Sequence, residues 1–268
     1  MSVATFEQRV TGLKLLGSHP TLKEASAILP DGVYSTFRTY ARRRVLRLGQ
    51  HVGRLLESAA LKGLPGTIDP RSVRAAVTAA LDATAFAESR FRVTFAPPRL
   101  FLSVEPFVPL PSRLYAEGAL CVTVPVRREN PRAKDTRFIA IASAAYGALP
   151  PGVEEGLMLA DDGSVLEGLS SNFFAVKAGR LWTEEDRVLK GVTRALVLEV
   201  AAEALPVERT PTRLEDDVEE CFITSVSREV LPVVSIDGRG VGAGRPGPVT
   251  RDIARRFTAL VEREAEPL

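Results

Sequence analysis

This chain of 268 residues is poor in the residues that mark several common protein classes. Its two cysteines, Cys121 and Cys221, are far apart and lack CxxC spacing, so neither a disulfide framework nor a zinc site is predicted. Both lie in apolar runs, where buried and unreactive thiols are expected. No stretch reaches the roughly 18 consecutive apolar residues that a membrane-spanning helix needs.

The chain also has no large excess of positive or negative charge. The formal net charge of +2 is too small to favour nucleic acid or an acidic membrane as a partner. The cluster Arg42–Arg44 has no interleaved aromatic residues, so it is interpreted as a solvated hairpin tip rather than a nucleic-acid site. The first residues, MSVATFEQRVTGLKLLG, lack the apolar core of a signal peptide. We therefore expect a cytoplasmic protein with no membrane or nucleic-acid partner.

Lysine is the scarcer basic residue. Among 35 basic residues the chain has six lysines, so an enzyme that needs a lysine amine has few candidates here. The hydrophobic content of 45% and the charged content of 25% are ordinary for a globular protein. The length allows one large domain or two modest ones.

Hydrophobic periodicity predicts an alternation of strands and helices. Residues 1–30 show little regular pattern apart from a short segment at SHPTLKEASAIL. Strands are predicted at 33–40, 45–48, 90–95, 100–108, 119–126, 155–160, 165–166, 172–177, 180–182, 218–224 and 230–236. Helices are predicted at 51–62, 70–83, 139–146, 193–205 and 249–264.

These elements indicate an α+β protein in two lobes. The proline-containing stretch PLPSRLYAEG, residues 109–118, is interpreted as the crossing between the lobes. We predict a small α/β domain at residues 1–112 and a larger, sheet-dominated domain at residues 113–268.

Four segments carry residue types that core packing does not explain. Each combines one chemically active side chain with glycine, proline or small polar neighbours. The segments are HVGRL with Arg54, PRAKDTRF with Lys134, DDGSVLEGLSSNFF with Glu167, and LKGVTR with Val192 and Thr193.

Together these segments supply the parts of a pyridoxal phosphate site. A lysine amine is needed to form the Schiff base and to move a proton at the amino acid's α-carbon. A carboxylate keeps the ring nitrogen protonated, so that the ring accepts electrons. A phosphate dianion is bound by a helix N-terminus and an arginine.

With these motifs in this order, the sequence resembles the class IV aminotransferases, the fold-type IV pyridoxal phosphate enzymes. The resemblance runs from about Asp31 to the C-terminus and includes the late stretch ECFITSVSREVLPVVSIDG. It implies a small α/β N-terminal domain, a larger β-barrel-like C-terminal domain and a homodimer. His51, which precedes Arg54 by one helical turn, is expected to be a structural hydrogen-bonding residue.

The resemblance also implies roles for the matching residues. Lys134 matches the Schiff-base lysine, and Glu167 matches the carboxylate that pairs with the ring nitrogen. Val226 stands where several transaminases have threonine, so its backbone N–H would serve the phosphate. The remaining cofactor-binding residues implied are Arg54, Val192, Thr193 and Ser225, and the substrate-binding residues expected are Tyr34, Arg38 and Ser227.

The activity expected is transfer of the amino group of a small amino acid, of branched-chain L- or D-amino-acid type, to a 2-oxo acid. The alternative is an aminodeoxychorismate lyase, favoured by Ser35 and Thr36, which stand where branched-chain enzymes carry a glutamate. That enzyme would release pyruvate and 4-aminobenzoate. A second alternative is a non-catalytic member that binds a metabolite. The sequence leaves open the handedness of the substrate and which arginine binds its carboxylate, with Arg92, Arg99 and Arg137 as candidates besides Arg38.

Overall fold

The computed structural model describes residues 2–268, and contacts divide the chain into two compact units. The first unit runs to Val108 and also takes in Ala133–Ala140 and Arg263–Leu268. The second unit comprises Pro109–Arg132 and Ile141–Glu262. Each unit is therefore assembled from separate stretches, and the single domain boundary at residue 112 stays a prediction.

An antiparallel sheet forms the base of the first unit. Its strands are β1 (Val3–Arg9), β2 (Gly12–His19), β3 (Val33–Tyr40), β4 (Arg44–Val45), β5 (Ser89–Ala96), β6 (Arg99–Pro106) and β16 (Glu266–Pro267). They lie in the order β16-β4-β3-β5-β6-β1-β2. Because side chains alternate along a strand, Val33, Ser35 and Phe37 face one side of the sheet, and Tyr34 and Arg38 face the other.

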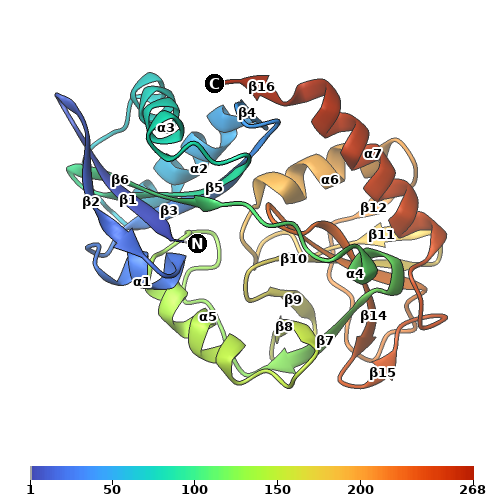
Figure 1. Cartoon of the computed structure of the whole chain (residues 1–268). Coiled ribbons are helices and arrows are strands. Elements are labelled where there is room, and N and C mark those ends of the chain that lie inside the picture. The colour runs from blue at the N-terminus through green and yellow to red at the C-terminus, as the bar shows by residue number, and fades with distance from the viewer. Residues whose placement is uncertain (1) are drawn as a thin grey trace. The chain divides into compact units, whose positions relative to one another are not determined.

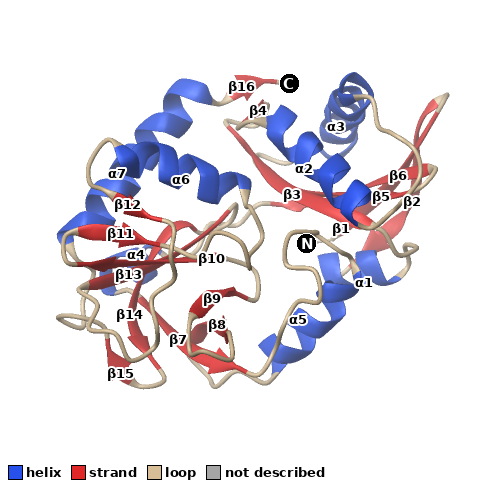
Figure 2. Cartoon of the chain, turned by 180° about the vertical axis from the view of Figure 1, so that it is seen from behind, coloured by secondary structure: helices blue, strands red, loops and turns tan. Residues whose placement is uncertain are grey.

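Three helices pack against this sheet. Figures 1 and 2 show α2 (Leu48–Leu61) and α3 (Pro70–Thr84) on one face, and these helices share a core with Phe37 and Phe91. Apolar residues recur every three or four positions in α2, which gives this helix one buried face. The short helix α1 (Leu22–Ala27) contacts β1, β2 and β6.

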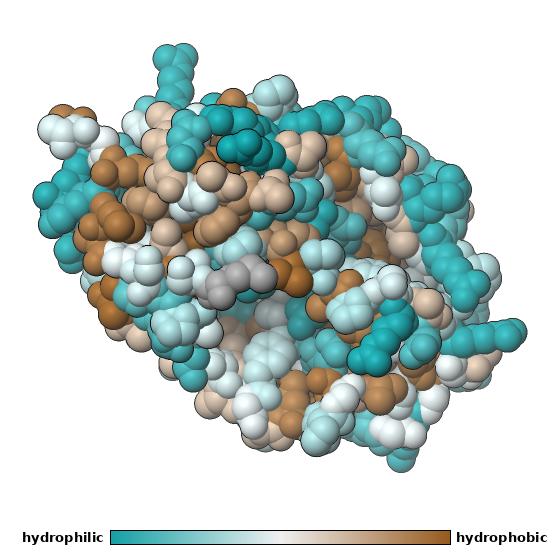
Figure 3. Space-filling model, viewed as in Figure 1, coloured by the Kyte–Doolittle hydropathy of each residue, from teal (hydrophilic) through white to brown (hydrophobic). Residues whose placement is uncertain are grey.

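The hairpin of β1 and β2 corrects the sequence analysis, which found little regular pattern in residues 1–30. The β2 sequence GLKLLGSH does not alternate between polar and apolar residues, and Val10 and Leu15 are exposed. The strands form because β1 pairs with β6 and β2 then pairs with β1. In Figure 3, apolar side chains reach the surface over this hairpin.

The strand predicted at residues 45–48 is also wrong. Strand β4 ends at Val45, and α2 already begins at Leu48. Arg47 has a positive φ of 52°, a left-handed conformation that is uncommon outside glycine and that ends the extended chain.

A closed ring of strands forms the centre of the second unit. Its strands are β7 (Ala119–Val124), β8 (Val153–Leu159), β9 (Val165–Gly168), β10 (Asn172–Lys177), β13 (Glu220–Ser225) and β14 (Glu229–Ile236). The order β10-β13-β14-β7-β8-β9 closes on itself because β9 pairs with β10 at Glu167 and Asn172. Short strands extend the sheet at β11 (Arg180–Trp182), β12 (Val207–Glu208) and β15 (Arg239–Gly240). This barrel-like sheet confirms the expected α+β class.

Two longer helices of this unit, α6 (Val192–Ala202) and α7 (Pro248–Glu264), lie side by side in both views (Figures 1 and 2). The start of α7 is capped by the carboxylate of Glu220, which accepts hydrogen bonds from the first N–H groups of the helix. The helix α5 (Arg137–Gly147) agrees with the predicted one.

The stretch PLPSRLYAEG is not only a crossing, because it contains the helix α4 (Ser112–Glu117). This helix ends at Gly118, where φ is +92° and a Cβ atom would lie 2.2 Å from the side chain of Val234. Glycine is therefore required at this position.

The two thiols behave as the sequence predicts: Cys121 and Cys221 are buried and free. Burial raises the pKa of both thiols well above the ordinary value. Within residues 2–268, no helix combines the length and apolar character needed to cross a membrane.

Candidate functional site

Lys134 lies in the first unit, and hydrogen bonds fix its backbone on two sides. Its carbonyl accepts a hydrogen bond of 2.9 Å from the N–H of Tyr34 on β3, and its own N–H donates to Ser58 Oγ on α2 at 3.1 Å. The ammonium Nζ lies 4.7 Å from the centre of the Tyr34 ring. Two predicted site residues, Lys134 and Tyr34, are thus brought together.

The residues that follow Lys134 are held equally firmly. The side chain of Asp135 pairs with Lys62 at the end of α2. The hydroxyl of Thr136 accepts a hydrogen bond of 2.9 Å from the N–H of Gly32, which immediately precedes β3. These contacts limit the movement of the lysine backbone.

Arg54 is buried in the first unit, with 9% of its surface exposed. Its Nη2 donates a hydrogen bond of 2.9 Å to Ser35 Oγ, while its buried Nε has no hydrogen-bond partner among the described residues. Burial lowers the pKa of Arg54 to about 10, so the side chain stays a cation at neutral pH. A buried cation with an unused N–H group is suited to bind an anion.

His51 lies beside Arg54 on α2 and is 4% exposed. Its Nδ1 is 3.2 Å from Ser35 Oγ. Burial, and after it the positive charges of Arg54 and Lys134, hold the pKa of His51 well below its ordinary value. The imidazole is therefore neutral near pH 7.

This pKa shift predicts a stability that depends on pH. Because only the unfolded chain binds a proton at His51 near pH 6, acidification favours unfolding, and the stability is lost as pH falls below 6.5. Between about pH 7.5 and about pH 5.5, the wild type should lose about 1.4 kcal/mol more than His51→Asn. Urea unfolding of both proteins at each pH measures the difference, and parallel losses would contradict the assignment.

The four arginines that the sequence suggests for binding a substrate carboxylate lie in different surroundings. Arg92 lies 5.1 Å from the Tyr34 ring centre. The Arg38 guanidinium lies over the rings of Tyr40 and Phe107, at 4.1 Å from each. Arg99 lies over Phe101, and Arg137 pairs with Asp135. Arg92 is thus the candidate that lies closest along the sheet to Tyr34.

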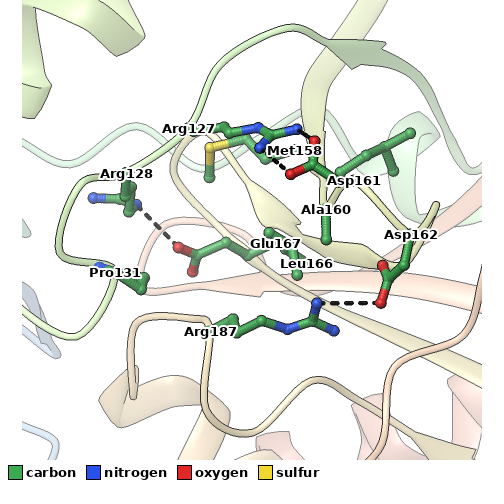
Figure 4. Close-up of a pocket in the computed structure, with 11 residues that line it drawn as sticks. Arg127, Arg128, Pro131, Met158, Ala160, Asp161, Asp162, Leu166, Glu167 and Arg187 are labelled. Atoms are coloured by element: carbon green, nitrogen blue, oxygen red, sulfur yellow. Dashed lines mark hydrogen bonds and ion pairs between the residues drawn. The ribbon is translucent and has the colours of Figure 1, made fainter.

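Glu167 lies in the second unit, where three groups converge on its carboxylate. Arg128 forms an ion pair with it, with 2.9 Å between Nε and Oε1, and the two side chains are 6% and 3% exposed. The Asn172 side chain and the Leu189 N–H each donate to Oε2 at 3.1 Å. Figure 4 shows Arg128 pointing at Glu167.

A cavity of about 400 Å³ opens beside Glu167. Figure 4 shows its rim, where Arg127 pairs with Asp161 and Arg187 pairs with Asp162. The charged side chains that line the cavity are therefore largely paired with one another. Among residues 2–268, no group of three or more His, Cys, Asp or Glu side chains is arranged to hold a metal ion.

The start of α6 has the free N–H groups that suit an anion. Gly191 precedes the helix, and no side chain among residues 2–268 caps the first N–H groups. A Cβ atom at Gly191 would lie 2.5 Å from Asn172 Oδ1, so the turn packs directly against this amide. Asn172 also donates to the carbonyl of Leu189, and so ties the helix start to Glu167. Val192 and Thr193 are buried in the first turn.

Ser225 is the last residue of β13, and Val226 and Ser227 follow it in the turn to β14. Ser225 Oγ accepts a hydrogen bond of 3.2 Å from the N–H of Arg228. The Arg228 side chain then reaches a buried network, where Nη1 donates to Ser170 Oγ at 2.9 Å and lies 3.5 Å from Glu155 Oε2.

Tyr146 completes this network, because its hydroxyl lies 2.5 Å from both Glu155 Oε1 and Ser170 Oγ. Although burial acts in the opposite direction, Glu155 and Tyr146 raise the pKa of Arg228 above its ordinary value. Glu155 has 0% of its side chain exposed. The network therefore fixes the 225–228 loop to β8 and to the β9–β10 turn.

Replacing Glu155 with leucine should destabilise the protein by about 3–5 kcal/mol, because Arg228 then stays buried without its counter-charge. Urea unfolding monitored by circular dichroism measures the loss. The matched control is Glu215→Leu, which removes an exposed partner of Arg213 and should cost less than about 1 kcal/mol. Equal losses in the two variants would contradict the importance of the buried pair.

Sequence reasoning did not identify Arg128, Asn172 or Arg228 as contributors. Asn172 could have been noticed, because it follows two serines and starts a strand five residues after Glu167. Arg128 and Arg228 carry no such signal in an arginine-rich chain, since their partners are distant in sequence.

Comparisons with known proteins agree over most of the chain. The family model described as amino-transferase class IV matches residues 32–236. The branched-chain-amino-acid aminotransferase of Pseudomonas aeruginosa is 38% identical over 133 residues, which are 48% of this chain and 43% of that protein. The D-alanine aminotransferase of Bacillus licheniformis is 39% identical over 101 residues, 36% of each chain. The chain thus spans about half the length, or less, of the curated relatives it matches.

Solved structures match over a longer range. The branched-chain aminotransferase from Thermoproteus uzoniensis, solved with norvaline, has a TM-score of 0.80 and 26% identity, and the match covers 98% of this chain and 96% of that one. The branched-chain amino acid aminotransferase from Escherichia coli has a TM-score of 0.79 at 22% identity, and that match covers 99% of this chain and 96% of the other. The second likeness is one of fold.

Proposed function

Because this chain belongs to the class IV aminotransferase family, we propose that it is a pyridoxal-phosphate-dependent aminotransferase acting on a small amino acid and a 2-oxo acid. The observation that carries the proposal is that the first unit holds both the amine of Lys134 beside Tyr34 and the buried cation of Arg54. The buried Nε of Arg54 has no hydrogen-bond partner among the described residues.

Each unit holds residues whose chemistry fits part of the cofactor. In the first unit the buried cation of Arg54 suits a phosphate group, and in the second unit the start of α6 at Val192 and Thr193 suits one as well. We propose that Ser225 and Val226 supply further hydrogen bonds to the phosphate, from a hydroxyl and a backbone N–H. Lys134 would hold the cofactor covalently through Nζ.

When bound, pyridoxal phosphate supplies an electron sink for the carbanion left after loss of the α-proton. Once the amine of the substrate has displaced it from the cofactor, Lys134 Nζ would take this proton from the α-carbon and deliver it to the cofactor carbon that carried the aldehyde. The Glu167 carboxylate, oriented by Arg128 and Asn172, would stabilise a proton on the ring nitrogen. The aromatic ring of Tyr34 packs against the Lys134 amine.

For the substrate we propose contacts from Tyr34, Arg38 and Ser227. A small amino acid is supported by the relatives, which are named for branched-chain amino acids and D-alanine, and by the relative solved with norvaline. One of these relatives is named for a D-amino acid, so L- and D-amino acids are both tested. By family resemblance we also propose a homodimer, which sedimentation equilibrium would test.

The proposed function is tested by amine exchange. Purified protein with pyridoxal phosphate is incubated with 2-oxoglutarate and each of a panel of L- and D-amino acids, and glutamate formation is measured. Glutamate formed with branched-chain amino acids or with alanine of one hand is the expected result. Release of pyruvate and 4-aminobenzoate from aminodeoxychorismate, without a 2-oxo acid and with no glutamate formed in the panel, would instead establish the lyase.

A further inference from the structure

Three buried side chains of the first unit form one hydrogen-bonded chain. Arg54 Nη2 lies 2.9 Å from Ser35 Oγ, and Ser35 Oγ lies 3.2 Å from His51 Nδ1. Ser35 is 1% exposed and His51 is 4% exposed. His51 and Arg54 come from one face of α2, and Ser35 comes from β3 across from that helix.

The direction of the first hydrogen bond follows from the groups themselves. A guanidinium group can only donate, so Ser35 Oγ accepts from Arg54. For the second hydrogen bond we infer that Ser35 donates its single hydroxyl hydrogen and that His51 Nδ1 accepts it. The imidazole proton therefore lies on Nε2, which agrees with the neutral state that burial and the nearby charges of Arg54 and Lys134 favour.

This chain of bonds holds Nη2 of the Arg54 guanidinium and leaves the Nε hydrogen to bind a ligand. Nη2 is held by Ser35, while the buried Nε has no hydrogen-bond partner among the described residues. The His51 ring is itself held by packing against Phe37, with 5.4 Å between ring centres. An arginine held in this way loses less rotamer freedom when an anion binds.

We propose that Ser35 and His51 are positioning residues that orient Arg54 toward the phosphate group of the cofactor. The inference rests on the proposed function, in which Arg54 binds that phosphate. Ser35 acts on Arg54 directly, and His51 acts through Ser35 by accepting its hydroxyl hydrogen.

The test compares two ligands that differ only in the phosphate. Dissociation constants are measured for pyridoxal 5′-phosphate and for pyridoxal, with wild type, Ser35→Ala and His51→Leu. Loss of a hydrogen bond to a charged group should weaken binding of pyridoxal 5′-phosphate about tenfold in each variant. Binding of pyridoxal should stay within about twofold of wild type, because pyridoxal has no phosphate for Arg54 to bind.

Conservative variants provide the rescue. Ser35→Thr keeps a hydroxyl group, and His51→Asn keeps an acceptor near the position of Nδ1, so both should bind pyridoxal 5′-phosphate within about threefold of wild type. Circular dichroism checks the fold of every variant. If His51→Leu does not fold, the dissociation constants of Ser35→Ala and Ser35→Thr are sufficient to test the positioning role.

Arg54→Leu separates failure of the inference from failure of the proposed function. If this variant binds pyridoxal 5′-phosphate as wild type does, the proposed phosphate role of Arg54 is wrong. If Arg54→Leu loses the preference for the phosphorylated ligand while Ser35→Ala and His51→Leu keep it, the positioning role alone is overturned. Equal weakening of both ligands in the two positioning variants would also overturn it.

Discussion

Replacing Lys134 with alanine is expected to lower the rate of transamination about 10³-fold or more and to remove the visible absorption band of the bound cofactor. The rate falls because no other group is proposed to move the proton at the substrate α-carbon, and a positioned acid–base group contributes about 10²–10⁴-fold. The band disappears because the covalent attachment through Nζ is lost. Steady-state kinetics and the absorption spectrum measure the two effects.

The matched control for this prediction is Lys177→Ala. Lys177 lies on β10, pairs with Asp216 and lies over the Trp182 ring, so its replacement should leave both the spectrum and the rate close to those of wild type. Retention of the absorption band in Lys134→Ala, with its loss in another lysine variant, would show that a different lysine holds the cofactor.

Replacing Glu167 with glutamine is expected to lower the transamination rate about 10²-fold, because a neutral amide no longer stabilises a proton on the ring nitrogen. The same change should cost about 3 kcal/mol of stability. Arg128 then remains buried beside an uncharged group, and breaking a buried pair from one side is strongly destabilising. Kinetics and urea unfolding measure the two losses separately.

A second substitution distinguishes the chemical effect from the structural one. In Glu167→Gln with Arg128→Met, the buried arginine is gone, so a large part of the stability should return. The rate should not return, because the carboxylate is still missing. Recovery of both quantities in the double variant would mean that Glu167 acts through the fold and not on the cofactor.

Much of the fold could be predicted from the sequence because most elements bury one face. The helices at Pro70–Thr84 and Pro248–Glu264 lie within a few residues of the predicted ones, since their apolar residues recur at helical spacing. The hairpin of β1 and β2 could not be predicted in this way. Strand β1 is specified by pairing with β6, where the partners Ala4 and Val104 are 100 residues apart in sequence, and β2, which pairs with β1, is largely exposed.

Some residues of the candidate site could also be predicted from the sequence, and others could not. Lys134, Glu167 and Arg54 could be named because each lies in a short sequence motif that resembles the class IV aminotransferases. Arg128 could not be named, because its ion pair with Glu167 forms only when the stretch after β7 packs beside β9. Nothing in the neighbouring sequence distinguishes this arginine from the many others in the chain. The link between Ser35 and Arg54 likewise depends on α2 packing against β3.

We propose that this chain exchanges amino groups through a cofactor held by Lys134. The most direct test is the visible absorption spectrum of the purified protein with pyridoxal phosphate, first with an amino acid added and then with a 2-oxo acid. We expect a band that fades with certain small amino acids and returns when the 2-oxo acid is added. Absence of any band after incubation with pyridoxal phosphate, or a band that no amino acid changes, would contradict it.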